Sequence, residues 1–236
     1  MEIVYWSDYA CPYCYIGETH MKTALQELSL TDKVKIEMKA FELDPFASKE
    51  YTGTTVDRFA RKYGLSTEAA AQRIEDISAM GRRAGLDFRY AQTRYTNTRD
   101  AHRLTKLAMA EYSPELVDKL SEAFYKAYFT DGLELANHAV LLQIALQVGM
   151  DEKRVRAVLE SREFEAAVVN DEVASAQENI HGVPYFIIAG KYAVPGAMPV
   201  DAMKELLQKV YEQERTPEEI IAATAGSACG PDGCSF

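Results

Sequence analysis

Two cysteines separated by two residues stand near the start of the chain, in the stretch YACPYCYIG at residues 9–17. Cys11 and Cys14 follow a short apolar run and precede a stretch whose apolar residues repeat at helical spacing. Two thiols at this spacing can bind a metal, close a small disulfide or exchange disulfides with another molecule. The strand-then-helix context favours the redox interpretation.

The start of a helix gives the two thiols different chemistry. The free N–H groups and the positive end of the helix dipole favour a thiolate, so we expect Cys11 to have a lower pKa than a free cysteine. Pro12 suits an early helical position, which needs no N–H. We predict that Cys11 exchanges with the substrate and that Cys14, facing inward, resolves the mixed disulfide. Pro12 and Tyr13 are expected to tune the potential and contact the substrate.

A second motif, HGVPYFII at residues 181–188, has a proline at the start of a strand. Proline cannot donate to a ladder and is therefore confined to strand starts, edge strands and turns. Such a structural role is sufficient to explain Pro184 when it is considered alone. Beside a CxxC motif, a cis Pro184 would place the carbonyl and N–H groups of Val183 near the sulfurs. An extended peptide could pair with them.

Strand and helix patterns divide the chain into three parts. The beginning reads β-α-β and the end reads β-β-α, with helices between them. We expect strands at 3–6, 33–40, 184–190 and 191–194, and sheet-flanking helices at about 11–28 and 200–213. Capping residues predict helix starts at Thr54, Ser66, Asn97 or Thr98, Ser113, Asn137 and Ser161.

This order predicts an α/β fold in which one sheet domain is interrupted by an all-helical insertion. The sheet domain would comprise residues 1–50 and 180–215, and the insertion residues 51–179. Residues 216–236 are small, polar and rich in glycine, and are expected to form a flexible tail.

Composition restricts the function. The 236 residues carry a formal net charge of -10, which argues against generic binding to nucleic acid or anionic membranes. No apolar run approaches the roughly 18 residues of a membrane span. The chain begins with a strand-like run rather than a leader, and four cysteines are too few for a disulfide scaffold. We therefore expect a cytoplasmic protein.

Three segments resemble one known family. The stretches SDYACPYCYIG, NTRDAHRL and GVPYFIIAGKYAVPGAMP look like the DsbA-like thioredoxin-fold oxidoreductases of the FrnE type, over residues 1 to about 213. The resemblance implies a thioredoxin fold with a helical insertion, Cys11 as nucleophile, Cys14 as resolving cysteine and Pro184 as the cis proline. Tyr13 stands where members often carry tryptophan, and where strongly oxidising relatives often carry histidine.

Other residues are candidates around this motif. Asp8 could relay a proton or raise the pKa of the nearby sulfur, or only shape its loop. The resemblance suggests that Asn97 and His102 line the site as substrate-binding residues, whereas a lone helical histidine is usually structural. Tyr15, Phe41 and Tyr185 could form an apolar rim for substrates.

The tail contains a second cysteine pair in CGPDGC at residues 229–234. Its turn-forming centre could bring Cys229 and Cys234 within disulfide range. The pair would then be a second redox pair that exchanges electrons with Cys11 and Cys14, a surface disulfide, free thiols or a weak metal clip. FrnE-type proteins with a C-terminal cysteine pair exist, which supports the first interpretation.

The leading hypothesis is a thiol–disulfide oxidoreductase or isomerase acting on protein or small-molecule thiols and disulfides. It needs no bound cofactor, and glutathione is a candidate redox partner. One alternative is a glutathione-using enzyme similar to kappa-class transferases and hydroxychromene-carboxylate isomerases, which typically use serine at the active position. Another is a non-catalytic interaction protein in which zinc binds all four cysteines. A homodimer is compatible with the sequence, but no long apolar stripe requires one.

Overall fold

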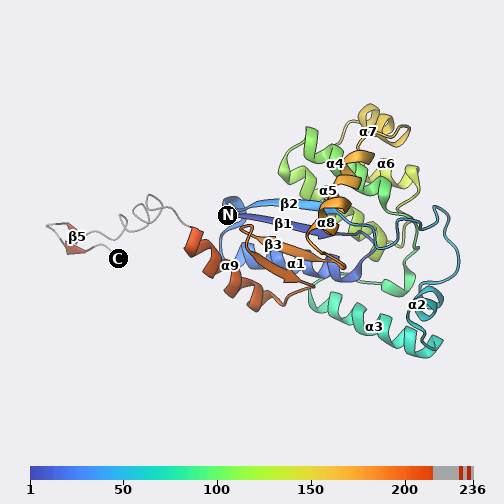
Figure 1. The fold of residues 1–236 in the computed structure, drawn as a ribbon, viewed down its shortest axis with the longest axis horizontal. Helices are drawn as coiled ribbons and strands as arrows, with labels where there is room; N and C mark the ends of the chain where they lie inside the picture. The colour runs from blue at the N-terminus through green and yellow to red at the C-terminus, as the bar shows by residue number, and fades with distance from the viewer. Residues whose placement is uncertain (215–228, 231–232, 235–236) are drawn as a thin grey trace.

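The central element of the molecule is a four-stranded mixed sheet with the strand order β2-β1-β3-β4 (Figure 1). The computed structural model describes residues 1–214, 229–230 and 233–234. Strand β1 (Glu2–Ser7) runs parallel to β2 (Lys35–Ala40) and antiparallel to β3 (Tyr185–Ile188), and β3 pairs with β4 (Tyr192–Pro195) in an antiparallel hairpin. The two outer connections therefore differ: a helix crosses between the parallel strands, and a tight turn joins the last two.

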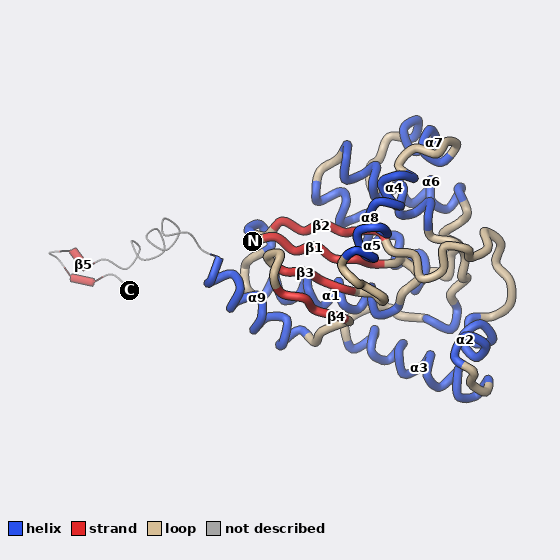
Figure 2. The backbone as a smooth tube through the Cα atoms, viewed as in Figure 1, coloured by secondary structure: helices blue, strands red, loops and turns tan. Residues whose placement is uncertain are grey.

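Helices cover both faces of this sheet (Figure 2). Helices α1 (Pro12–Glu27) and α9 (Val200–Glu214) pack against each other and bury apolar residues such as Met21 and Leu207. Helix α8 (Glu165–Gln177) covers the opposite face, where the Trp6 indole donates to the Asp171 carbonyl at 3.0 Å. The β-α-β and β-β-α units around one sheet form a thioredoxin fold, as predicted.

The chain between β2 and β3 is helical. Its elements are α2 (Thr55–Tyr63), α3 (Thr67–Arg83), the short 3-10 turn η2 (Tyr90–Gln92), α4 (Arg99–Glu111), α5 (Pro114–Phe129), α6 (His138–Gln147), α7 (Glu152–Leu159) and α8. The Tyr15 ring of α1 stacks on Tyr125 of α5 at 4.9 Å, so one continuous core joins the sheet to these helices. The predicted division into two domains stays a prediction.

Most predicted helix starts coincide with side-chain caps. Thr54, Ser66, Ser113 and Asn137 each accept a backbone N–H at the start of α2, α3, α5 and α6. The predicted start at Ser161 is wrong. Its hydroxyl accepts the Glu163 N–H at 3.1 Å within a bend, and α8 begins only at Glu165.

The tail contributes two short paired strands, β5 (Cys229–Gly230) and β6 (Gly233–Cys234). Their antiparallel register places the backbone of Cys229 opposite that of Cys234. The other residues of the predicted flexible tail, 216–228, 231–232 and 235–236, lie outside the described residues. No helix in the described part of the chain is long and apolar enough to cross a membrane.

Candidate active site

Cys11 lies where β1 gives way to α1. It is the residue immediately before the helix and has an extended backbone, with φ -91° and ψ 115°. The expected helical position of Cys11 is therefore displaced by one residue, and Pro12 opens the helix. The Cys11 carbonyl accepts the Cys14 N–H at 3.1 Å, which begins the first turn. Both cysteines are free thiols. This position keeps Cys11 beside the positive end of the helix dipole.

The cis-proline loop lies directly against Cys11. The Val183–Pro184 peptide bond is cis, as the resemblance implied. The Cys11 thiol donates to the Val183 carbonyl at 3.5 Å, so the two sequence motifs meet although they are 172 residues apart. The Pro184 carbonyl accepts the Gly196 N–H at 2.8 Å, which ties this loop to the end of β4.

Gly17 allows α1 to approach this loop. A Cβ atom at position 17 would lie 3.0 Å from Pro184 Cγ and 3.3 Å from Ala197 Cα. Such distances are shorter than most carbon–carbon contacts in proteins, and one of the neighbours is backbone. Glycine at this position therefore sets the separation between the helix that carries the thiols and the loop that faces them.

Cys14 is the more buried of the two thiols, at 0% exposure against 4% for Cys11. Burial, followed by the hydrogen bond and charge of Cys11, raises the pKa of Cys14 well above its ordinary value. Hydrogen bonds from the Ser7 hydroxyl and the Asp8 backbone oppose this rise in pKa. The Ser7 hydroxyl also pairs with the Tyr125 hydroxyl at 2.5 Å. Cys14 is therefore a protonated thiol at neutral pH whose hydroxyl neighbours can stabilise its thiolate.

Asp8 is buried and shapes the loop before Cys11. Its carboxylate accepts the Ala10 N–H at 3.1 Å, the Leu43 N–H at 2.8 Å and the Thr98 hydroxyl at 2.9 Å. These bonds join the end of β1, the loop after β2 and the start of α4. The geometry supports the loop-shaping role that the sequence left open for Asp8.

Asn97 and His102 are both buried rather than exposed. The Asn97 side chain donates to Glu42 at 3.1 Å and accepts the Arg99 N–H at 3.0 Å. His102 is 1% exposed, and its Nε2 atom lies 3.7 Å from the Asp8 carboxylate. In this conformation both residues support loops, and neither side chain presents a surface to a substrate.

A partly buried ionic cluster adjoins this region. Arg99 donates to Glu42 through Nε at 2.7 Å and also lies 3.7 Å from Glu172 on α8. Burial, followed by the hydrogen bond and charge of Glu42, raises the pKa of Glu172 to about 7. The cluster was missed by sequence analysis because its members are distributed over three elements. Among the described residues, no three histidine, cysteine, aspartate or glutamate side chains converge in the manner of a metal site.

The expected rim residues separate in the structure. Tyr13 is partly exposed beside Cys11, and Phe41, Tyr185 and Val183 are intermediate in exposure. Tyr15 is buried instead, because its ring stacks on Tyr125 in the core.

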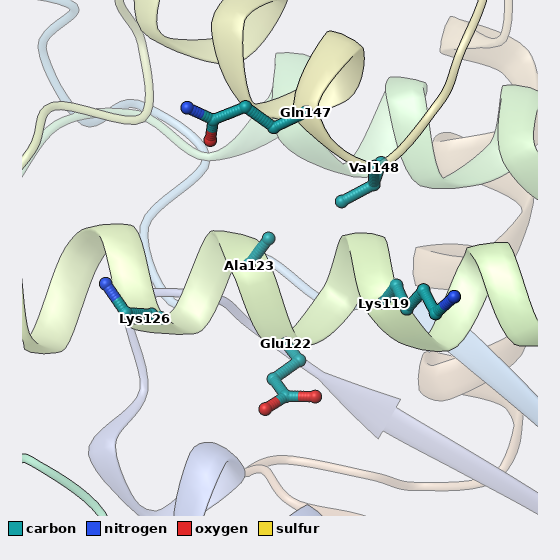
Figure 3. A pocket seen from close by; sticks show the side chains of 6 residues that line it. All are labelled: Lys119, Glu122, Ala123, Lys126, Gln147 and Val148. Carbon is teal, nitrogen blue, oxygen red and sulfur yellow. The ribbon is translucent and has the colours of Figure 1, made fainter.

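A separate pocket, of about 360 Å³, lies between α5 and α6 in the helical segment (Figure 3). It is lined by Lys119, Glu122, Ala123, Lys126, Gln147 and Val148, none of which belongs to the CxxC or cis-proline motif.

Comparison with known proteins agrees with this geometry. The family model described as DSBA-like thioredoxin domain matches residues 2–208. The chain belongs to this family. The crystal structure of a probable DsbA oxidoreductase, SCO1869 from Streptomyces coelicolor, is 34% identical, with a TM-score of 0.84 and coverage of 100% of this chain and 99% of that one. Membership supports an oxidoreductase that acts on thiols or disulfides.

Two further relatives are more distant. The uncharacterized protein YwbO of Bacillus subtilis is 26% identical over 91% of this chain and 98% of its own length. The cytosolic disulfide reductase DsbM from Pseudomonas aeruginosa, solved with GSH, is 12% identical with a TM-score of 0.62, over 90% of this chain and 100% of that one. At that identity DsbM shares the fold with this DSBA-like protein.

Proposed function

We propose that this DSBA-like protein catalyses thiol–disulfide exchange through Cys11 and Cys14. The observation that carries the proposal is the contact between the Cys11 thiol and the carbonyl before the cis Pro184, at 3.5 Å. The loop offers backbone groups of Val183 beside the reacting sulfur, where an extended substrate can pair with them.

The exchange proceeds in two balanced steps. The Cys11 thiolate attacks one sulfur of a substrate disulfide, forms a mixed disulfide and expels the other substrate sulfur as a thiolate, which takes up a proton. Cys14 then loses its proton and attacks Cys11 Sγ, which releases the second substrate sulfur and leaves a Cys11–Cys14 disulfide. The reverse sequence oxidises a substrate dithiol. The raised pKa of Cys14 favours this order, because a protonated thiol does not compete with Cys11 for the substrate.

Substituting each cysteine separately tests the proposal. Cys11→Ser is expected to abolish turnover of a peptide disulfide, whereas Cys14→Ser should accumulate mixed disulfides at Cys11, detected by mass spectrometry of the intact protein. Full exchange activity in Cys11→Ser would exclude the mechanism. Cys11 and Cys14 also disfavour the transferase or isomerase alternative, whose members typically use serine there. Binding of glutathione by the double serine variant would revive that alternative.

We also propose that glutathione is a redox partner of this protein and that the protein acts in the cytoplasm. A relative with this fold, DsbM, is described as a cytosolic disulfide reductase and was solved with GSH.

We further propose Cys229 and Cys234 as a second redox pair that exchanges with Cys11 and Cys14. Its support is the backbone register that places the two residues opposite each other. The zinc-binding alternative predicts about one zinc per chain and four protected thiols, which metal analysis with a thiol count measures.

A further inference from the structure

The loop that follows β2 begins beside the segment that leads to Cys11. Strands β1 and β2 are parallel and end together, with Ser7 opposite Ala40, so both segments leave the sheet at the same end (Figure 1). The Phe41 N–H donates to the Ser7 carbonyl at 3.0 Å, which continues the pairing beyond the strands. Residues 42–48, called here the 42–48 loop, therefore start next to the turn that carries the reacting thiol.

Asp8 connects this loop to Cys11. Its backbone carbonyl accepts the Cys11 N–H at 3.0 Å, which closes a turn and keeps the Cα atoms of the two residues within about 7 Å of each other. Its carboxylate accepts the Leu43 N–H at 2.8 Å. One residue thus binds the backbone of Cys11 on one side and the backbone of the 42–48 loop on the other.

Hydrogen bonds rather than a lysine or arginine compensate the charge of Asp8. The residue is 1% exposed, and its carboxylate also accepts the Ala10 N–H at 3.1 Å and the Thr98 hydroxyl at 2.9 Å. Among the described residues, only His102 lies within ion-pair distance of Asp8, at 3.7 Å, and its buried Nε2 atom makes no hydrogen bond. Loss of one donor would therefore leave a buried negative charge less compensated beside Cys11.

Asn97 holds the 42–48 loop at three points. Its side-chain amide donates to the Glu42 carboxylate at 3.1 Å and to the Pro45 carbonyl at 3.4 Å. Its backbone N–H donates to the Ser48 carbonyl at 2.9 Å. The side chain is buried, so water does not readily replace these bonds. The loop is therefore fixed between Asn97 on one side and the sheet on the other.

We propose that Asn97 is a positioning residue for Cys11 and acts through the 42–48 loop and Asp8. The Asn97 amide keeps the Leu43 N–H on the Asp8 carboxylate. Asp8 in turn keeps Cys11 at the start of α1, where the helix dipole favours its thiolate. The inference rests on the proposed exchange function and adds a residue that acts on the thiol without touching the substrate.

Asn97 also caps α4, and a suitable variant separates the two roles. Its Oδ1 atom accepts the Arg99 N–H at 3.0 Å. Asn97→Ser retains an oxygen that can cap the helix but lacks the amide donors. Asn137→Ala is the matched control, because the Asn137 Oδ1 atom accepts the Ala139 N–H at 2.9 Å at the exposed start of α6. The control therefore removes a helix cap of the same geometry far from the 42–48 loop in the sequence.

The pH dependence of alkylation at Cys11 tests the proposal without requiring turnover. The Cys11 thiolate displaces iodide from iodoacetamide, and peptide mass mapping follows the reaction between about pH 4 and pH 9. Arg99 still binds Glu42 in Asn97→Ser, so we expect the loop to loosen rather than detach. The pH of half-maximal rate should rise by about half a unit, and the rate below that pH should fall about threefold. Asn137→Ala should retain the wild-type profile.

Hydrogen exchange locates the effect along the proposed path. The Leu43 and Cys11 N–H groups should both exchange faster in Asn97→Ser than in wild type, as measured by NMR, because each donates to Asp8. Unchanged exchange at both amides would contradict the path through Asp8, even if the alkylation profile shifts.

Two alkylation results would overturn the proposal. One is an unaltered profile in Asn97→Ser, and the other is a slower rate with an unshifted pH midpoint, which altered packing alone would produce. If Asn97→Ser does not fold, Thr98→Val provides the same measurement on the next link of the path. It removes the hydroxyl that donates to Asp8 from a buried side chain of similar shape, and the midpoint should again rise. An unaltered midpoint in Thr98→Val would also contradict the proposal.

Turnover separates this inference from the exchange function. Near neutral pH, kcat/KM of Asn97→Ser for a peptide disulfide should fall by about the same factor as its alkylation rate, about threefold. If the wild-type protein turns over no disulfide, the exchange function fails, and the alkylation profile still decides whether Asn97 positions Cys11.

Discussion

The two thiols of the CxxC motif are chemically distinct because their surroundings are distinct. Cys11 lies before the first turn of α1 and contacts the cis-proline loop, whereas Cys14 is fully buried. In the proposed exchange, release of a mixed disulfide requires the Cys14 thiolate, and burial disfavours that charge. The nearest hydroxyl groups, Ser7 and Tyr125, are paired with each other at 2.5 Å. We therefore expect Ser7 to act in the proposed exchange as a positioning residue, through Cys14.

Ser7→Ala should slow the second step of exchange. Loss of a hydrogen bond to a charged sulfur raises the pKa of Cys14 further, and we expect release of a preformed mixed disulfide to be about tenfold slower at pH 7. The pH at which release reaches half its maximum rate should also move upward. Stopped-flow measurement of release across pH 6–10 would show both effects.

The control is Ser78→Ala, which removes another buried serine hydroxyl that binds only the Ile74 carbonyl within α3. It should leave the release profile as in wild type. If Ser7→Ala releases substrate at the wild-type rate at every pH, Ser7 has no part in the step. A lower rate with an unshifted pH profile would indicate a packing effect instead.

Residue types and spacing predicted which groups react but not the groups that surround them. Cys11, Cys14 and Pro184 were predicted because each belongs to a short motif with its own chemistry. Ser7 carries no such local pattern. Its hydroxyl pairs with that of Tyr125, which is 118 residues away in the chain. The role of His102 stays a prediction, and the side chain is buried against the Tyr9 ring and the Asp8 carboxylate.

At the scale of elements, the site depends on how closely α1 approaches the cis-proline loop. Gly17 lies one turn after Cys14, where any side chain would meet the Pro184 ring. If α1 and the loop moved apart, the distance between the Cys11 thiol and the Val183 carbonyl would increase. The absence of a side chain at Gly17 therefore helps to set that distance.

Gly17→Ala should lower the exchange activity of the protein. A Cβ atom 3.0 Å from Pro184 Cγ displaces the loop by a few tenths of an ångström, and we expect kcat/KM for a peptide disulfide to fall about tenfold. Gly182→Ala is a matched control, because a Cβ there meets no atom within 4 Å. Equal activity of the two variants would show that the approach of α1 does not control the site.

Element boundaries followed from local capping chemistry wherever the cap was the dominant interaction. Thr54 and Ser66 begin helices because each side chain accepts an N–H three residues later. Ser161 carries the same chemistry but bonds only two residues ahead, so the chain bends before α8. Asp151, which caps α7, was missed although its type is equally favourable. The sequence pattern could not tell which of these residues caps a helix, because the packing of the helices decides where each helix begins.

Helix α8 contributes a pH-dependent term to stability through Glu172. Its pKa is about 7 in the folded protein against an ordinary 4.5, because of burial and the nearby Glu42. The folded state therefore retains a proton between these values. The stability from this proton is fully present below about pH 4.5 and is lost as the pH rises through 7. Arg99 and His102 face the same carboxyl and oppose the shift in pKa.

Glu172→Gln should flatten the pH dependence of the free energy of unfolding between pH 4.5 and 7. The variant should be more stable than wild type at pH 8 and closest to it at pH 5, as measured by urea denaturation. Glu178→Gln, at the exposed end of α8, is the control and should follow the wild-type curve. A Glu172→Gln curve parallel to wild type would contradict the assignment.

At the scale of the whole molecule, the thioredoxin sheet brings together segments from both ends of the chain. Pairing of β1 with β3 places Trp6 opposite Tyr185, so Cys11 and Pro184 lie at the same end of these paired strands. The sequence predicted this meeting from a cis proline beside a CxxC motif, not from the order of the elements. The packing of seven intervening helices was beyond the sequence pattern, because their contacts join residues far apart in the chain.

The tail pair gives the last prediction, which concerns electron transfer within one chain. If Cys229 and Cys234 exchange with Cys11 and Cys14, one equivalent of oxidant should first oxidise the CxxC pair and then distribute the disulfide between both pairs. Oxidation of the tail pair should be slow in Cys11→Ser, because the tail then lacks its intramolecular partner. Quenched alkylation and peptide mapping would follow both disulfides in time. Tail oxidation in Cys11→Ser at the wild-type rate would show that the second pair reacts independently, and Cys229 and Cys234 would then belong to a separate surface disulfide.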